Sequence, residues 1–503
     1  MALIPEGGVV HGEIKDNLLR IGWEDGNERF NIEEHKMVSD YSGLEGSLGG
    51  FVLWNILEGK IRELNGSFFA NLTEEEEEKV WEEIRRKLES AGGEVETLEY
   101  LKYGLSLTSL GRYDRVKLID YDNPTNNIFF FLHEAKFPGS PDNIKPDFTL
   151  FINGGVPVVI IEAKARGGII ELEDVDWRRW SKVQGTEEEA LAQIRRYERY
   201  SKPLFRFVQF GGVAYGGDKQ LYTPTMPSGG SAPAFEWRYP PDEEKPDVFD
   251  LLKPERLLDV LRYYTFFFRR NGRGGAKRIK VIARWNQYRA TKRIIGRIEE
   301  YLSMEGEKRN GLVWQWQGSG KTFIMFFVAN WFLNRYKGRN PVTFFVVDRT
   351  DLKTQHSGVF ESVEDREFRE HFDVVKNISE LRKRIEEMMK SEETGRVIPT
   401  GIHITTIQKF QYGKFRDLVR VKKSRDGEKF EAERAVKKPE VLFLIDEAHR
   451  TQYGRLASVM RALFPRAMFF ASQGRRYSRG AGTRSRSSPI PRMGGSTSST
   501  FTS

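Results

Sequence analysis

The stretch KPDFTLFINGGVPVVIIEAKA, residues 145–165, decides the fold expected for the first half of this chain. Two extended runs flank Asn153-Gly154, a dipeptide that favours a tight β-hairpin turn. The second run is apolar up to Glu162 and Lys164, and charged residues are uncommon on a strand that is otherwise buried. The stretch therefore predicts a hairpin with charged side chains at its open end.

The length of the turn decides which side chains meet. If the turn contains Asn153-Gly154 alone, Asp147 lies opposite Ile160. Side chains alternate between the two faces of a strand, so Ile160, Glu162 and Lys164 share one face and Asp147 joins them. A three-residue turn would put Asp147 on the other face. The shorter turn brings two carboxylates and an ammonium group together.

Two neighbouring carboxylates suit an oxygen-seeking divalent ion such as Mg²⁺, which also binds substrate phosphate. A nearby lysine can orient the attacking water or stabilise the charge that develops on phosphorus. The alternative is that Glu162 and Lys164 are ordinary surface residues of an edge strand. Farther along the chain, Gln193 and Tyr197 stand at positions i and i+4 and so share one helix face.

These residues resemble two elements of known nucleases. Asp147, with Glu162 and Lys164, matches the motif of PD-(D/E)xK nucleases, and Gln193 with Tyr197 matches the Gln-x-x-x-Tyr element of their RecB-like branch. The resemblance implies that the first three residues cleave DNA, with Mg²⁺ held by the two carboxylates. Gln193 and Tyr197 would support the site and contact DNA.

A second group of residues, Gln317-Gly318-Ser319-Gly320-Lys321-Thr322, follows an apolar run and opens a helix. Glycines let backbone N–H groups wrap a phosphate at a helix N-terminus, Lys321 would reach the β- and γ-phosphates of ATP, and the Thr322 hydroxyl would ligate Mg²⁺. Gln315 replaces the first glycine usual in such loops. The predicted ATP-binding residues of this loop are Gly318, Ser319, Gly320, Lys321 and Thr322.

The run 441–445 indicates a buried strand that ends in Asp446-Glu447-Ala448-His449. A carboxylate at the C-terminal end of such a strand lies where an α/β domain meets its ligand. Asp446 can hold Mg²⁺ through water, and Glu447 can polarise the hydrolytic water. The two motifs follow each other in the order that one ATP site requires.

Further segments resemble the motor motifs of superfamily 2 helicases and translocases. Gln287 matches the glutamine that reads adenine, and His449 matches the histidine that couples the ATP state to DNA contacts. Residues 346–349 and 405–410 match segments that touch the DNA backbone. With the nuclease motif before them, and with residues 119–121 and Asn127 upstream, these motifs are similar in order to the restriction (R) subunit of type I restriction-modification enzymes.

This resemblance implies an ATP-dependent DNA endonuclease and translocase subunit that uses Mg²⁺ and ATP. Its partners would be double-stranded DNA and the methyltransferase (M) and specificity (S) subunits, which carry the DNA recognition. Two alternatives stay open: a solitary repair helicase-nuclease, and an inactive ATP- and DNA-binding remnant. Neighbouring methylase and specificity genes would favour the restriction subunit over the solitary repair enzyme. Measuring ATP hydrolysis and DNA cleavage would separate the inactive remnant from both enzymes.

The expected fold class is α/β. We place a PD-(D/E)xK nuclease domain at residues 1–250, a helical connector at 251–276, a RecA-like parallel α/β motor domain at 277–470 and a disordered tail at 471–503. The Pro- and Gly-rich stretch 222–246 suggests the first boundary. Four β-rich runs, 311–316, 342–347, 402–406 and 441–445, are separated by helix-length segments and indicate the motor. Near the N-terminus, Thr73 and Glu76 predict a capping box for a helix with a solvated acidic face.

Composition sets further limits. With 39% apolar and 30% charged residues among 503, the chain has the make-up of an ordinary soluble protein. The longest nearly uncharged apolar run, 322–333, is shorter than the roughly 20 residues that span a bilayer, and no signal pattern opens the chain, so we expect a cytoplasmic protein without a membrane partner. The absence of cysteine excludes disulfides and thiolate zinc sites.

Net charge gives no support for nucleic-acid binding. The formal charge is +8, but residues 474–503 contain six arginines and no acid, which leaves +2 for the rest of the chain. This stretch is also rich in Gly, Ser and Thr and cannot bury a core.

The family resemblance calls for Thr-Gly-Thr-Pro after the strand near Met468, and for a second motor domain. Codons for the six residues from Ala471 can be chosen so that another reading frame encodes Ile-Thr-Gly-Thr-Pro. We therefore expect a frameshift at Ala471 and a chain truncated after its first motor domain. A basic nucleic-acid-binding arm is the alternative.

Overall fold

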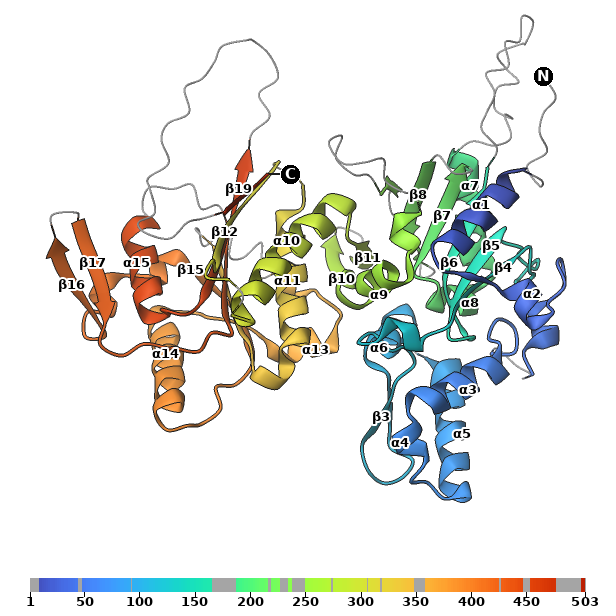
Figure 1. Ribbon diagram of the computed structural model, residues 1–503, viewed down its shortest axis with the longest axis horizontal. Coiled ribbons are helices and arrows are strands. Elements are labelled where there is room, and N and C mark those ends of the chain that lie inside the picture. Colours follow the sequence, from blue (N-terminus) through green and yellow to red (C-terminus); the bar gives the residue numbers. More distant parts are fainter. Residues whose placement is uncertain are drawn as a thin grey trace, which may run out of the picture. The chain divides into compact units, whose positions relative to one another are not determined.

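The computed structural model describes residues 9–43, 48–91, 93–164, 187–215, 219–226, 234–237, 249–272, 275–304, 306–316, 319–347, 358–424, 427–446, 453–475 and 499–502. The chain divides into two compact units, Met1–Trp285 and Asn286–Ser503. Both units mix helices with a large sheet (Figure 1), so the predicted α/β class is confirmed. Among the described helices, none is long and apolar enough to cross a membrane.

The first unit is built on a seven-stranded mixed sheet of order β1-β4-β5-β6-β7-β8-β9. The β1–β4 and β6–β7 pairs are parallel and the others are antiparallel. Helices α1, α7 and α8 contact the central strand β6. The strands are β1 (Glu24–Asp25), β4 (Phe129–His133), β5 (Phe148–Ile152), β6 (Val156–Ala163), β7 (Phe210–Tyr215), β8 (Lys219–Pro224) and β9 (Phe235–Glu236), and the helices are α1 (Val9–Arg20), α2 (Gly26–Phe30), α7 (Glu187–Tyr200) and α8 (Lys202–Phe207).

The hairpin of β5 and β6 differs from the predicted two-residue turn. Ile152 pairs with Val156, so the turn has three residues, 153–155. The register then shifts at a β-bulge near Pro157, from Phe151 opposite Pro157 to Leu150 opposite Val159. A bulge is where a proline, which lacks the ladder N–H, is tolerated. Turn and bulge each add one residue, and the two together restore the face on which the sequence predicted Asp147.

Packing against helix α3 (Trp54–Leu64) explains the longer turn. Asn153 and Gly154 have φ of 55° and 80°, in the left-handed region that glycine enters without strain. A Cβ on Gly154 would collide with Ile56, and one on Gly155 would lie 2.5 Å from a methyl group of Leu57. Two glycines are therefore needed where the turn meets the helix.

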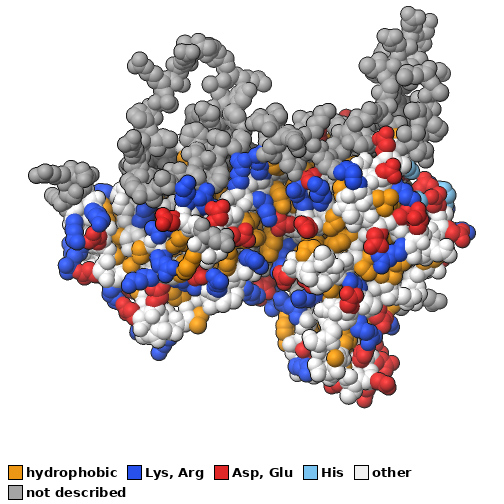
Figure 2. All heavy atoms as spheres, in the orientation of Figure 1, with side chains coloured by type: hydrophobic (Ala, Val, Ile, Leu, Met, Phe, Trp, Pro, Cys, Tyr) orange, Lys and Arg blue, Asp and Glu red, His pale blue; other side chains and the backbone are white. Residues whose placement is uncertain are grey.

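A mainly helical part of the first unit lies between α2 and β4 in the chain. Its elements are α3, α4 (Gly66–Phe69), α5 (Glu74–Ser90), α6 (Glu94–Tyr103) and the short strands β2 (Leu105–Leu107) and β3 (Asp114–Val116). The predicted capping box is confirmed, because the Thr73 hydroxyl accepts from the backbone N–H of Glu76 and the Glu76 carboxylate accepts from that of Thr73. Acidic side chains gather on the surface over α5 (Figure 2), the predicted solvated face.

Residues 251–276 differ from the helical connector that the sequence suggested. Helix α9 (Pro254–Tyr263) is followed by the long strand β10 (Thr265–Gly272), which forms a hairpin with β11 (Gly275–Ile282). The β-favouring run TFFF, whose aromatic side chains are buried against the first unit, explains the strand. This segment lies within the first compact unit.

The second unit has a seven-stranded sheet of order β14-β15-β13-β18-β19-β12-β20, in which every neighbouring pair is parallel. Its strands are β12 (Asn310–Trp316), β13 (Val342–Val347), β14 (Phe372–Val374), β15 (Gly401–Thr406), β18 (Val441–Ile445), β19 (Met468–Arg475) and β20 (Ser499–Thr502). The helices are α10 (Trp285–Leu302), α11 (Lys321–Arg335), α13 (Arg366–His371), α14 (Ile378–Glu393) and α15 (Tyr453–Leu463), and β16 (Val419–Ser424) with β17 (Gly427–Ala432) forms a separate hairpin. The four predicted strands of the parallel α/β domain are confirmed.

Part of the predicted disordered tail is ordered. Residues 471–475 continue β19 beside β12, and Ser499–Thr502 pair with the other side of β12. Open ladder positions on β12 explain both strands, because backbone pairing does not require apolar side chains. Residues 476–498 lie outside the described part of the chain.

Candidate nuclease and nucleotide sites

The open end of the β5–β6 hairpin brings Asp147 and Glu162 together. Phe148 pairs with Ile161, so the register continues with Asp147 opposite Glu162. The backbone N–H of Ala163 donates to Asp147 Oδ2 at 2.7 Å. Lys164 follows directly, with its side chain buried. The three residues therefore meet at one end of the sheet, as the sequence predicted, although through a different turn.

Glu162 is the unusual member of this group. Its side chain is 0% exposed, and neither carboxylate oxygen makes a hydrogen bond within the described part of the chain. The backbone of Asp147 lies nearby and acts to lower the pKa of Glu162, but this effect is smaller than that of burial. Burial, together with the negative charge of Asp147, raises the pKa of Glu162 well above its usual range. Burial also raises the pKa of Asp147. A buried carboxylate without a hydrogen-bond donor, next to a second carboxylate, fits a hard cation such as Mg²⁺, which takes oxygen ligands.

Helix α7 supplies the predicted supporting pair. The Gln193 side-chain amide donates to the Tyr197 hydroxyl at 2.7 Å, and this hydroxyl donates to the backbone carbonyl of Lys145 at 2.9 Å. Burial and the charge of Glu162 raise the pKa of Tyr197, so the hydroxyl keeps its proton. The pair therefore ties α7 to the chain just before Asp147.

Two further residues at this site escaped the sequence analysis. His11, on α1, has Nε2 at 3.7 Å from Asp147 Oδ1 and Nδ1 at 3.9 Å from Glu134 Oε1. The backbone N–H of Glu134 donates to the carbonyl of Asp147 at 2.9 Å. Glu134 ends the apolar run of β4 as Glu162 ends that of β6, so the same signal marks it. No comparable signal marks His11.

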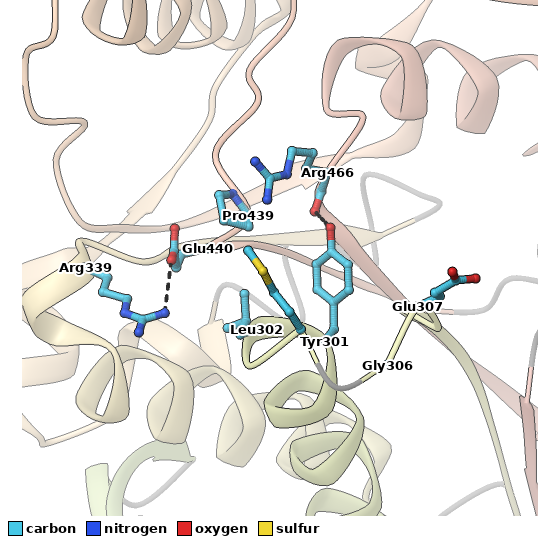
Figure 3. A pocket seen from close by; sticks show the side chains of 9 residues that line it. Tyr301, Leu302, Gly306, Glu307, Arg339, Pro439, Glu440 and Arg466 are labelled. Atoms are coloured by element: carbon cyan, nitrogen blue, oxygen red, sulfur yellow. Dashed lines mark hydrogen bonds and ion pairs between the residues drawn. The ribbon is translucent and has the colours of Figure 1, made fainter.

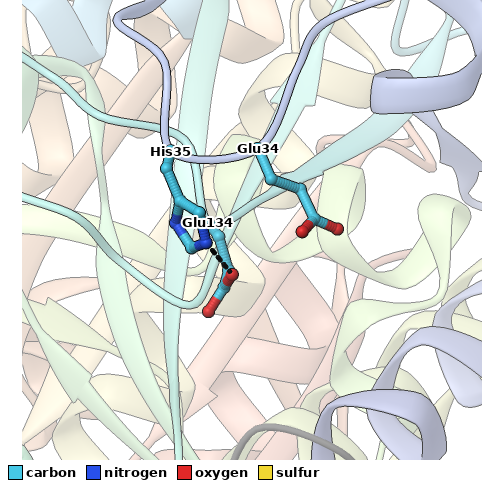
Figure 4. Close-up of side chains that lie close together, drawn as sticks. All are labelled: Glu34, His35 and Glu134. Atoms are coloured by element: carbon cyan, nitrogen blue, oxygen red, sulfur yellow. Dashed lines mark ion pairs between the residues drawn. The ribbon is translucent and has the colours of Figure 1, made fainter.

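A group of possible metal ligands adjoins Glu134. Figure 4 shows Glu34 and His35 on one loop beside Glu134, and their donor atoms lie within 4.8 Å of one another. His35 Nε2 lies 3.1 Å from Glu134 Oε2, and Lys145 Nζ lies 3.6 Å from Glu134 Oε1. His35 and Lys145 thus already lie within ion-pair distance of the Glu134 carboxylate, so this group is a cluster of polar side chains near Asp147.

Of the upstream residues, Asp120 and Asn127 brace the hairpin turn. Asn127 accepts from the backbone N–H of Asp120 and from the side-chain amide of Asn153, both at 2.9 Å. Asn153 in turn accepts from the backbone N–H of Ile128 at 2.9 Å. These residues therefore hold the left-handed turn in place at a distance from the carboxylates.

The phosphate-loop motif of the second unit lies between β12 and α11. Gly320 has φ of +83° and caps α11, which begins at Lys321. The side-chain amide of Gln287 donates to the carbonyl of Ser319 at 3.1 Å, and a Cβ on Gly320 would collide with that amide. Gln287 is thus placed against the loop, and Thr322 lies in the first turn of α11.

Asp446 stands directly after β18, at the same edge of the sheet as the end of β12. It is buried, and its Oδ1 accepts from the Ser472 hydroxyl of β19 at 2.7 Å. Strand β19 separates β18 from β12, so the two strands lie about 10 Å apart sideways at usual strand spacing. Ile445 and Leu312 both pair with Ala471, so β12 continues about 13 Å beyond the level at which β18 ends.

Three predicted site residues, Gly318, Glu447 and His449, lie outside the described residues, as do Asp348 and Arg349. The segment 405–410 is described, and there Lys409 is buried with Nζ donating to the carbonyl of Val375 at 2.6 Å. This lysine therefore does not offer its ammonium group to DNA in the conformation seen.

Two family models match the chain. The model described as "Type I restriction enzyme R protein N terminus" matches residues 6–229, and the model of the SWI2/SNF2 ATPase matches residues 286–478. The first match contains the hairpin carboxylates, and the second contains the phosphate loop and Asp446.

Curated relatives agree with these matches. The chain is 37% identical over 462 residues to the MjaVIIP endonuclease subunit and 35% identical over 467 residues to the MjaVIIIP subunit of Methanocaldococcus jannaschii, both named for type I restriction enzymes. These alignments cover 75% and 91% of this chain, and 41% of each relative. The HindI endonuclease subunit of Haemophilus influenzae is 27% identical over 68% of this chain and 30% of its own length. The chain thus spans less than half the length of these relatives.

Proposed function

Because the chain belongs to the family of type I restriction enzyme R proteins, we propose that it is the ATP-dependent endonuclease and translocase subunit of such a complex. The observation that carries the proposal is the buried Glu162 carboxylate beside Asp147, without a hydrogen bond from the described residues. We assign the nuclease, with a PD-(D/E)xK fold, to residues 1–250 and the RecA-like motor to residues 277–470.

In the nuclease, Asp147 and Glu162 would hold Mg²⁺, which activates water and neutralises phosphate charge when bound. The Ala163 N–H fixes one oxygen of Asp147, so its other oxygen is left to face the ion. Lys164 would place its ammonium group beside the scissile phosphate and stabilise the charge that develops there. Gln193 and Tyr197 would keep α7 against this end of the sheet and contact DNA.

In the motor, Gly318, Ser319 and Gly320 would wrap the ATP phosphates with their backbone N–H groups. The side chains of the motor would have these roles. Lys321 would bind the β- and γ-phosphates, and Thr322 and Asp446 would hold Mg²⁺. Glu447 would polarise the hydrolytic water, Gln287 would bind adenine and His449 would couple hydrolysis to DNA contacts. The hydrogen bond from Gln287 to Ser319 supports this proposal, since it keeps the side chain of Gln287 beside the phosphate loop.

The partners of this subunit would be double-stranded DNA and the methyltransferase and specificity subunits, in the cytoplasm. The described part of the chain offers no helix suited to a membrane. Base recognition would reside in the specificity subunit, so this chain would bind DNA through its backbone.

Metal and nucleotide binding test the two halves of the proposal separately. Mn²⁺ can replace Mg²⁺ and is detected by electron paramagnetic resonance. Asp147→Ala should lose Mn²⁺ binding in nucleotide-free protein and keep ATP binding, whereas Lys321→Ala should do the reverse, because it removes the cation that meets the phosphates. Equal Mn²⁺ binding by parent and Asp147→Ala would refute the nuclease assignment, and equal ATP affinity in Lys321→Ala would refute the motor assignment.

A further inference from the structure

The second unit contains a cavity of about 500 Å³ at the edge of its sheet that is remote from the nucleotide motifs. Arg339 lies before β13, Pro439-Glu440 before β18 and Arg466 before β19. The cavity is therefore at the amino ends of the parallel strands, whereas Lys321 and Asp446 stand at or beyond the carboxyl ends. Ligands of the ATP site bind at the carboxyl ends, so this cavity is a separate feature.

The wall of the cavity is apolar and unusually exposed. Tyr301, Leu302 and Met304, from the end of α10 and the turn after it, line it together with Pro439. Met304 is 84% exposed, the highest value among the exposed large apolar side chains of the described residues. Figure 3 shows Tyr301 and Arg466 facing each other, joined by the hydrogen bond from the Tyr301 hydroxyl to the Arg466 carbonyl.

A second cavity, of about 340 Å³, is formed by the same loops. Its lining includes Asn340, which follows Arg339, and Lys438, which precedes Pro439. It also includes Val397, which is 69% exposed. The two most exposed large apolar side chains of the described residues thus border two cavities whose linings adjoin in the chain, at 339–340 and at 438–439.

The charged side chains that line the two cavities differ in whether they have a partner. Glu440 is already paired with Arg339 at 3.6 Å and with Lys438 at 3.4 Å. Figure 3 shows the Glu307 carboxylate turned away from the cavity. The guanidinium group of Arg466 makes no ion pair within the described part of the chain.

Arg396 of the second cavity likewise has no ion pair among the described residues. Its acidic neighbour Glu392 is engaged by the backbone N–H groups of Lys437 and Lys438, at 2.8 and 2.6 Å. Across both cavities, the Glu440 and Glu392 carboxylates have partners within the second unit, whereas the Arg466 and Arg396 guanidinium groups and the Glu307 carboxylate make no ion pair among the described residues. The complement of this surface is a carboxylate placed next to an apolar side chain.

We propose that this face of the second unit binds an acidic polypeptide segment that inserts an apolar side chain beside Met304 and pairs a carboxylate with Arg466. Duplex DNA is a poorer complement, because its phosphates would gain nothing from the apolar side chains of Met304 and Val397. A polypeptide with alternating apolar and acidic residues satisfies both parts of the surface.

The absence of cysteine from the chain allows a direct test. In the full chain, Met304→Cys gives a single thiol that can carry an environment-sensitive fluorophore. The probes are a short peptide of alternating glutamate and leucine, the same peptide with lysine for glutamate, and a duplex DNA oligonucleotide. Tyr113→Cys, at a side chain that is 60% exposed in the first unit, is the matched control.

We expect the glutamate peptide to shift the fluorescence at position 304, with no shift at position 113, and the lysine peptide and the duplex to bind more weakly. Adding Arg466→Glu should weaken the glutamate peptide by about fivefold and strengthen the lysine peptide, as one exposed charge pair predicts. Equal binding of the two peptides, preference for the duplex, or an unchanged preference in Arg466→Glu would each overturn the proposal.

Discussion

Replacing Glu162 with Gln should make the metal-free protein more stable at neutral pH. Glu162 is fully buried, and burial with the charge of Asp147 raises its pKa well above the ordinary value of 4.5. A carboxyl group with a raised pKa in the folded state holds its proton more tightly there than in the unfolded chain. The folded state therefore loses stability as the pH rises above about 4.5, until the group is ionised in both states.

The size of the effect follows from proton linkage. One extra proton on the folded state changes the free energy of unfolding by up to about 1.4 kcal/mol per pH unit. The raised pKa of Asp147 adds to the slope in the parent protein. Glu162→Gln should remove the part of this slope that Glu162 contributes, up to about 1.4 kcal/mol per pH unit. Mg²⁺ should stabilise the parent more than the variant, because an ion between the carboxylates favours their charged forms.

Urea-dependent proteolysis in EDTA, followed by mass spectrometry of peptides from β5 and β6, would report the stability of the first unit separately from the second. Glu82→Gln is the matched control, since Glu82 is exposed on α5. If Glu162→Gln and Glu82→Gln show the same dependence of stability on pH, or if Glu162→Gln is the less stable of the two at pH 7, the reasoning is refuted.

Three further changes test other parts of the structure. Gly155→Ala should lower the free energy of urea unfolding by about 1–3 kcal/mol, because the added Cβ overpacks against α3. Gly59→Ala is the control on α3: its Cβ would meet nothing within 4 Å, so it should not lower the stability. Gly320→Ala should weaken binding of a fluorescent ATP analogue about tenfold, because the left-handed backbone and the amide of Gln287 leave no place for a Cβ. Burial lowers the pKa of Lys280 to about 7 from 10.5, so parent stability should rise with pH between these values, by up to about 1.4 kcal/mol per unit, and thermal unfolding of Lys280→Met should lack that rise.

The buried strands of the second unit are the part of the fold that the sequence predicts best. The structure gives Val342–Val347 and Val441–Ile445 with the predicted bounds. Strands covered on both faces are continuous apolar runs with sharp ends, so local sequence contains their limits. The capping box of α5 is predictable for the same reason, because its partners are close in the chain.

The hairpin shows where local sequence fails. Its three-residue turn depends on the packing of Gly154 and Gly155 against α3, and the compensating bulge lies near Pro157. The contact with α3 is not encoded within the hairpin, whereas Pro157 lies in the hairpin and is a residue that a bulge tolerates. The predicted face of Asp147 is right because two one-residue additions shift the register by two, which keeps the face. His11 reaches the site from a helix with no pattern of its own.

Cleavage of circular DNA by the chain assembled with methyltransferase and specificity subunits tests the central claim most directly. With ATP and Mg²⁺, the parent should cut, while Asp147→Ala and Lys164→Ala should abolish cutting and keep ATP binding, since the two sites lie in separate units. Glu82→Gln should cut like the parent. Cutting by both site variants at the rate of the parent, or no cutting by the assembled parent, would contradict the account.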